Sequence, residues 1–129
     1  MTIKVELAYG ELLDKITILQ IKSERITDES KLSNVNKELG LLNDLWKSDN
    51  KSLVDISDEF TALKEINEKI WDIEDSIRDK ERVKEFDDKF IELARSVYFS
   101  NDKRAEIKRA INLKLGSELI EEKSYSDYE

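Results

Sequence analysis

A row of polar and aromatic side chains runs through the stretch INEKIWDIEDSIRDK, residues 66–80, beside its regularly spaced isoleucines. The row consists of Asn67, Trp71, Glu74 and Arg78, which share one stripe of a helix because residues three or four apart are neighbours there. One interpretation is structural: Glu74 and Arg78 pair within the helix, and Trp71 covers the edge of the core. The other is a binding surface with an aromatic wall, a carboxylate and a cation.

A second polar set follows between residues 85 and 116. In one continuous helix, Asn101, Arg104 and Lys108 lie inside the stripe that Phe90 and Val97 otherwise keep apolar. Polar groups on such a stripe need acidic neighbours, an anionic ligand or the acidic tail of the chain as partners. The alternative is a helix break after residue 100, which would turn Asn101, Arg104 and Lys108 to solvent. Both interpretations are open at the level of the sequence.

The two polar sets predict a pocket if they face each other across the groove between two neighbouring helices. An aromatic wall, a carboxylate and several cations suit a small anionic or sugar-like molecule. We therefore expect a binding or interaction module with a ligand site. The candidate site residues are Asn67, Trp71, Glu74, Arg78, Asn101, Arg104 and Lys108.

Paired carboxylates point to a second class of function. Glu65 and Glu68, followed by Glu85 and Asp88, repeat the ExxE and ExxD spacing of helical magnesium-dependent nucleotide pyrophosphohydrolases. Because of this spacing, the alternative function is that of an enzyme acting on a phosphorylated or nucleotide-linked substrate. With the isoleucines at the a and d positions of a heptad, however, Glu65 and Glu68 take the solvent-facing c and f positions. We therefore expect no metal site and no cofactor.

The composition limits both the fold and the partners. Charged residues make up 40% of the 129-residue chain, apolar residues 39%, and proline is absent, a mixture typical of long helices. The net charge of −8 opposes binding to nucleic acid or to an anionic membrane surface. Since neither a secretory leader nor an apolar run of membrane-spanning length is seen, we expect a soluble cytoplasmic protein.

The apolar periodicity predicts an all-α fold in one domain over residues 1–129: an antiparallel helical hairpin plus two longer helices, similar to a four-helix bundle. The expected order is an extended segment over 1–9, helices over 11–27 and about 30–46, a loop over 47–52, helices over 52–82 and 85–116, and an acidic tail over 117–129. Ser52 is the candidate cap of the third helix, and Gly116 the end of the fourth. The third helix carries an isoleucine-rich seam longer than the hairpin covers, which predicts a homodimer.

One carboxylate near the N-terminus stands apart from the main apolar seam of its helix. Asp14 shares a stripe with Ile18 and Ile21, so we expect it to face a second helix. Its structural role would be that of a first-turn carboxylate, which the helix dipole favours.

Three blocks of the sequence match a pattern seen elsewhere: GELLDKITILQIKSERITDESKL, INEKIWDIEDSIRD and FIELARSVYFSNDKRAEIKRAINLKLGSELIEEKSY. In this order and spacing the chain resembles a family of small bacterial and phage proteins catalogued as a domain of unknown function (family 6165). The resemblance covers almost the whole chain and is least distinctive over residues 33–60. It implies no activity, cofactor or substrate. The matching blocks contain Asp14, Lys15, Asn67, Trp71, Glu74, Asp75, Arg78, Arg95, Asn101, Asp102, Arg104, Arg109 and Tyr125.

Overall fold

The computed structural model describes residues 2–127, which form four α-helices and one short 3-10 helix and contain no strand. In chain order these elements are α1 (Tyr9–Arg25), α2 (Glu29–Ser48), η1 (Asn50–Leu53), α3 (Ser57–Arg82) and α4 (Asp88–Leu115). The expectation of an all-α fold is therefore confirmed. Residues 1, 128 and 129, the outermost parts of the predicted extended segment and tail, lie outside the described residues.

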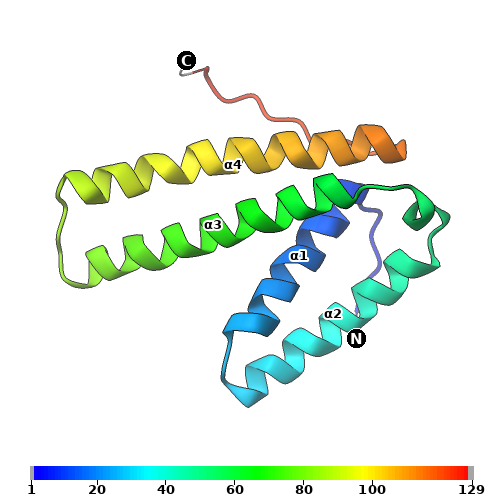
Figure 1. Cartoon of the computed structure of the whole chain (residues 1–129), viewed down its shortest axis with the longest axis horizontal. Helices are drawn as coiled ribbons and strands as arrows, with labels where there is room; N and C mark the ends of the chain where they lie inside the picture. Colours follow the sequence, from blue (N-terminus) through cyan, green and yellow to red (C-terminus); the bar gives the residue numbers. More distant parts are fainter. Residues whose placement is uncertain (1, 128–129) are drawn as a thin grey trace.

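The helices form two hairpins that cross (Figure 1). α1 and α2 form the shorter hairpin, and α3 and α4 run antiparallel to each other as the longer one. α1 packs against all three other α-helices, whereas the main contacts of α2 are with α1 and η1. α1 is thus the central helix, and it crosses only one half of the α3–α4 hairpin (Figure 1). None of the helices within residues 2–127 is long and apolar enough to span a membrane.

Local signals explain three of the helix ends. The Asp28 carboxylate accepts a hydrogen bond from the Lys31 amide at 2.9 Å and so caps α2. Asp87 caps α4 in the same way, accepting from the Phe90 amide at 3.0 Å. Gly116 follows α4 with a φ of 66°, the left-handed conformation that ends helices without steric cost for glycine. The predicted stop at Gly116 is therefore confirmed.

Two expectations about helix boundaries are corrected. The third helix begins at Ser57 rather than at Ser52, because residues 50–53 form η1 and Asp55 accepts hydrogen bonds from both the amide and the hydroxyl of Ser57. The alternative of a helix break after residue 100 is wrong: α4 continues through this region. The polar residues beyond Ser100 therefore keep the inward phase that a continuous helix gives them.

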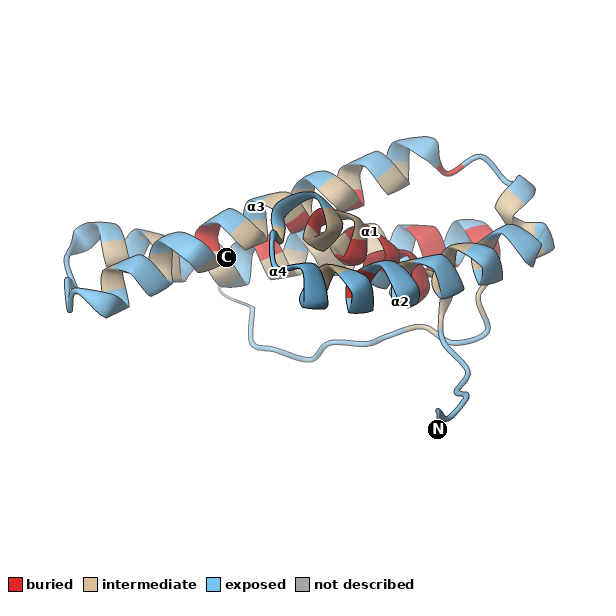
Figure 2. Ribbon diagram, turned by 90° about the horizontal axis from the view of Figure 1, so that it is seen from below, coloured by how far each residue is buried: buried red, intermediate tan, exposed pale blue. Residues whose placement is uncertain are grey.

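The core lies where α1 crosses the other helices, and the buried residues gather there (Figure 2). Gly10 makes the close crossing possible, because a Cβ at this position would lie 2.5 Å from the Lys108 carbonyl oxygen. The Gly10 amide also donates to Asn112 Oδ1 at 2.6 Å. The buried apolar cluster consists of Leu12, Leu13, Ile16, Ile56, Leu63, Ile111 and Leu115.

Burial stops along the α3–α4 hairpin once the hairpin passes α1. Within the predicted isoleucine-rich seam, Leu63 and Ile73 are buried, but Ile77 is only partly covered. From Glu74 to Phe99 no residue is buried. We call residues 74–99 the hairpin tip; in Figure 2 it is the end that projects away from the other helices.

Candidate functional site

A buried amide, Asn67, connects α1, α3 and α4. Its side chain is 4% exposed, and its Nδ2 donates to Asp14 Oδ1 at 2.8 Å and to Thr17 Oγ1 at 2.9 Å. The Thr17 hydroxyl donates to the Asp14 carbonyl at 2.8 Å, so its oxygen is left to accept from Asn67. These contacts fix the amide orientation and point Oδ1 of Asn67 toward α4. Asp14 faces a second helix, as its separate stripe predicted.

Arg104 takes up the remaining oxygen of this amide. Its Nη1 donates to Asn67 Oδ1 at 3.2 Å, and its Nη2 donates to Asn101 Oδ1 at 2.9 Å. Two neutral oxygens therefore hold the guanidinium in place without neutralising it. Among residues 2–127, no carboxylate lies within ion-pair distance of Arg104.

A hollow of about 340 Å³ opens beside Arg104, between the half-covered part of α3 and the helices α1 and α4. Five of the seven predicted site residues, Asn67, Trp71, Glu74, Arg78 and Arg104, line it. Asn101 adjoins it through its hydrogen bond to Arg104. We call this hollow the Arg104 groove; its complete lining is Ile18, Asn67, Ile70, Trp71, Glu74, Asp75, Arg78 and Arg104.

The stripe on α3 also makes the ion pair that its structural interpretation predicted. Arg78 donates to both the carboxylate and the carbonyl of Glu74, one turn earlier on the same helix. Trp71 receives the Arg25 guanidinium 5.8 Å from its ring centroid. The structural contacts and the groove therefore coexist, and the partners of Arg104 are the two amides rather than Glu74.

Lys108 does not line the Arg104 groove. Its ammonium contacts Glu11 at 2.7 Å, Glu121 at 3.0 Å and Asp14 at 3.8 Å, and its side chain is 12% exposed. Burial opposes the charge, but the hydrogen bonds to Glu11 and Glu121 prevail and raise the pKa of Lys108. This lysine is already surrounded by carboxylates, one of which comes from the acidic tail. Of the partners foreseen for the second polar set, Lys108 has two: acidic neighbours, Glu11 and Asp14 on α1, and the acidic tail through Glu121.

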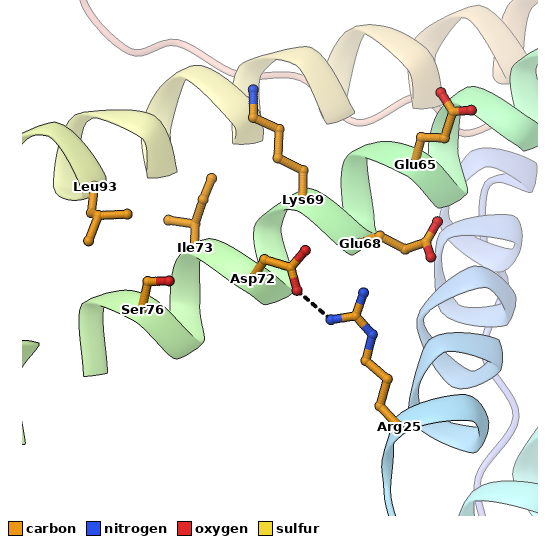
Figure 3. Close-up of a pocket in the computed structure, with 8 residues that line it drawn as sticks. All are labelled: Arg25, Glu65, Glu68, Lys69, Asp72, Ile73, Ser76 and Leu93. Atoms are coloured by element: carbon orange, nitrogen blue, oxygen red, sulfur yellow. Dashed lines mark hydrogen bonds and ion pairs between the residues drawn. The ribbon is translucent and has the colours of Figure 1, made fainter. Parts of the chain in front are cut away.

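The paired carboxylates lie in separate places. Glu65 and Glu68 line a different hollow of about 520 Å³, to which α1 contributes Arg25 and α4 contributes Leu93; here Arg25 pairs with Asp72 at 2.5 Å (Figure 3). Glu85 follows the end of α3 and Asp88 begins α4, beyond about 20 Å of helix at 1.5 Å per residue. The structure therefore does not bring the two pairs together. Within the described part of the chain, no group of three or more His, Cys, Asp or Glu residues could hold a metal ion.

The model of a family of unknown function (DUF6165) matches residues 3–128. The chain belongs to this family. The match includes all of the groove residues, and it extends over residues 33–60, where the sequence blocks were least distinctive. Neither the curated proteins nor the solved structures contain a match to the chain. Family membership thus supplies no activity, and any function has to be argued from the groove.

Some members of the site were not foreseen from the sequence. Ile18, Ile70 and Asp75 line the groove, and Thr17 orients Asn67. Thr17 lies three positions after Asp14 on the same helical face, a spacing that could have pointed to the pair. No sequence signal could have located the groove walls contributed by α1, because they depend on how far along α3 the helix α1 crosses.

Proposed function

We propose that the chain is a binding module whose Arg104 groove takes a small anionic, sugar-like ligand. The observation that carries the proposal is the environment of Arg104, whose charge is held by two amide oxygens without a carboxylate partner among residues 2–127. A guanidinium that is already oriented loses little conformational entropy when it pairs with an anion, and it can donate two parallel hydrogen bonds. This supports an anionic group as the anchor of the ligand.

The rest of the groove suits the remainder of such a molecule. Trp71 and Ile70 offer apolar surface to a ring, and the carboxylates of Glu74 and Asp75 are hydrogen-bond acceptors for hydroxyl groups. The volume of about 340 Å³ lies near the lower end of the range of about 300 to 1,000 Å³ that small-molecule pockets occupy. A monosaccharide phosphate has the size and the chemistry that these walls favour.

Tryptophan fluorescence tests this proposal, because Trp71 lines the groove and the chain has only one other tryptophan, Trp46. In a Trp46→Phe background, titration with glucose 6-phosphate is expected to change the Trp71 fluorescence to saturation. Inorganic phosphate should compete, and glucose should bind at least about tenfold more weakly because it lacks the anionic group. A fluorescence that none of the three probes changes would contradict the proposal.

A matched pair of variants on α4 locates the binding. Arg104→Ala is expected to abolish the fluorescence change, whereas Lys103→Ala removes the same charge from an exposed position next to it and should bind as the parent does. Equal binding by both variants would refute the role of Arg104. Turnover of glucose 6-phosphate during the titration would instead favour the alternative function, an enzyme acting on a phosphorylated or nucleotide-linked substrate.

We also propose that the module is a homodimer. The support is the seam on α3: one copy buries Leu63 and Ile73 but leaves Ile77, beyond the part of α3 that α1 crosses, only partly covered. Burying apolar surface that remains in contact with water is the main driving force for association. Light scattering is expected to give a mass that rises above the chain mass of 15.1 kDa at micromolar concentrations and approaches twice this value as the concentration increases.

A further inference from the structure

The hairpin tip is a folded segment without a core. It comprises 26 consecutive residues, of which none is buried. Its α3 part, residues 74–82, and its α4 part, residues 88–99, are the ends of helices of 26 and 28 residues, and neither part exceeds the roughly 12 to 15 residues below which an isolated helix is marginal in water. Helical segments of this length are held by the packing of an apolar face. α1 meets only the near end of the tip, where Ile18 and Arg25 share hollows with it, and α1 and α2 leave the rest of the tip uncovered (Figure 1).

The apolar face that needs cover is present on the tip. Phe86 is 56% exposed and Ile91 is 53% exposed, and Val83 at the turn is exposed as well. Ile77, Phe90 and Leu93 are only partly covered by the opposite helix. Phe86 and Phe90 already meet edge to face with ring centroids 5.2 Å apart, so their apolar surfaces form one patch.

We infer that the hairpin tip is the surface on which a second copy of this chain packs, so that two tips form a four-helix arrangement. The inference rests on the homodimer proposed above and needs no ligand, although Glu74, Asp75 and Arg78 at the near end of the tip also line the Arg104 groove. A two-fold axis through the tips pairs the same patch with itself, which is the commonest form of a symmetric dimer. Each tip then gains the apolar cover that its own chain does not provide.

The charges of the tip favour a second copy over a charged partner. Five of its six cations pair with carboxylates of the tip itself, so they are not available to attract nucleic acid or an anionic lipid surface. The same pairing limits the repulsion between two identical tips. The five cations are Arg78, Lys80, Arg82, Lys84 and Lys89.

The area available matches a modest dimer. The α4 part of the tip is about 18 Å long at 1.5 Å per residue, and two adjacent helices are about 20 Å wide. The flat area that one tip offers to a second copy is therefore on the order of 400 Å². The accessible surface that each partner would bury there is at or below the roughly 800 Å² per partner of standard interfaces. We therefore expect a dimer that dissociates in the micromolar range.

Light scattering on the full chain over a concentration series tests the surface. Phe86→Ser and Ile91→Ser are each expected to raise the dissociation constant at least about tenfold, whereas Leu41→Ser, at a 65% exposed position on α2, should leave it unchanged. A parent chain that stays at 15.1 kDa would overturn the dimer and the tip surface together. A dimeric parent whose tip variants behave like Leu41→Ser would overturn the tip surface alone.

A second measurement does not depend on how the tip variants fold. The chain has no cysteine, so a spin label on Ser76→Cys reports only on the tip, and one on Lys37→Cys reports only on α2. The distance between the two labels of a dimer is expected to be shorter for Ser76→Cys than for Lys37→Cys, and the reverse order would refute the inference. The glucose 6-phosphate response of Trp71 should survive Phe86→Ser, which separates a failure of this inference from a failure of ligand binding.

Discussion

Replacing Asn67 by alanine is the sharpest test of the site architecture, because this one amide satisfies groups on two other helices. The variant removes three hydrogen bonds: those that Asn67 Nδ2 donates to Asp14 Oδ1 at 2.8 Å and to Thr17 Oγ1 at 2.9 Å, and the one that Arg104 Nη1 donates to Asn67 Oδ1 at 3.2 Å. The other oxygen of Asp14 keeps only the 3.8 Å contact to Lys108. Arg104 keeps its bond to Asn101.

The expected cost follows mainly from the losses at Asp14 and Arg104, because the Thr17 hydroxyl still donates to the Asp14 carbonyl. A buried polar group left without its partner costs about 1 to 3 kcal/mol, and Asp14 is buried while Arg104 is partly exposed. Asp14 therefore contributes the larger share, Arg104 a smaller one, and the space left by the amide adds to both. We expect Asn67→Ala to lower the free energy of unfolding by about 2 to 4 kcal/mol, which corresponds to a fall in Tm of roughly 10 °C for a chain of this size.

Urea denaturation followed by circular dichroism measures this cost, with the protein concentration held fixed because a dimer makes stability depend on it. Asn101→Ala is the matched control, since it removes the other amide that holds Arg104 but not the contacts to α1. Asn101→Ala is expected to lower the free energy of unfolding by less than about 1.5 kcal/mol. A cost for Asn67→Ala below about 1 kcal/mol, or equal to that of Asn101→Ala, would refute the argument that Asn67 is the junction of the three helices.

Three further substitutions test the packing and the pH response. Gly10→Ala is expected to destabilise the protein by about 1 to 3 kcal/mol, because its Cβ would meet the backbone oxygen of Lys108 at 2.5 Å. Gly40→Ala, in the interior of α2 with nothing within 4 Å of the new Cβ, should stabilise it by about 0.5 to 1 kcal/mol in the same denaturation experiment. Hydrogen bonds from the Phe90 amide and Lys80 hold the pKa of Asp87 below its ordinary value of 3.8. The Asp87 carboxylate therefore stabilises the fold fully above pH 3.8, and this stabilisation is lost as the pH falls through the lower pKa of the folded state. Asp87→Asn keeps a side chain that can cap α4 but does not titrate as a carboxylate does. The variant should therefore lose less stability on acidification than the parent, and equal losses would contradict the role of the Asp87 carboxylate.

Much of the fold could be predicted because its determinants are local. The period of the apolar residues predicts the helices, and Asp28 and Gly116 mark two of their ends. The start of α3 was placed five residues too early because Ser52 resembles a cap, whereas the neighbouring Asp49 and Asp55 direct residues 50–53 into η1 and begin the helix at Ser57. Competing short-range caps of this kind cannot be ranked from spacing alone.

The site was predictable only as far as helical phase determines it. Phase placed Trp71 and Arg104 on facing stripes, and both line the same hollow. Lys108 has the same phase as Arg104, yet it lies where α1 and the tail supply Glu11 and Glu121. The difference arises from where α1 crosses α4, which is a tertiary property without a periodic signal in the sequence.

The contact between the start of α1 and the end of α4 also bears on the order of folding. Gly10 and Asn112, which are joined by a 2.6 Å hydrogen bond, lie 102 positions apart in the chain, whereas Lys80 reaches Glu85 over only five. Closing the longer loop costs more chain entropy, so the α3–α4 hairpin is expected to form first and the α1–α4 contact late. Interactions that form after the transition state act mainly on the rate of unfolding. In stopped-flow experiments Gly10→Ala should therefore unfold faster than the parent while refolding at nearly the same rate.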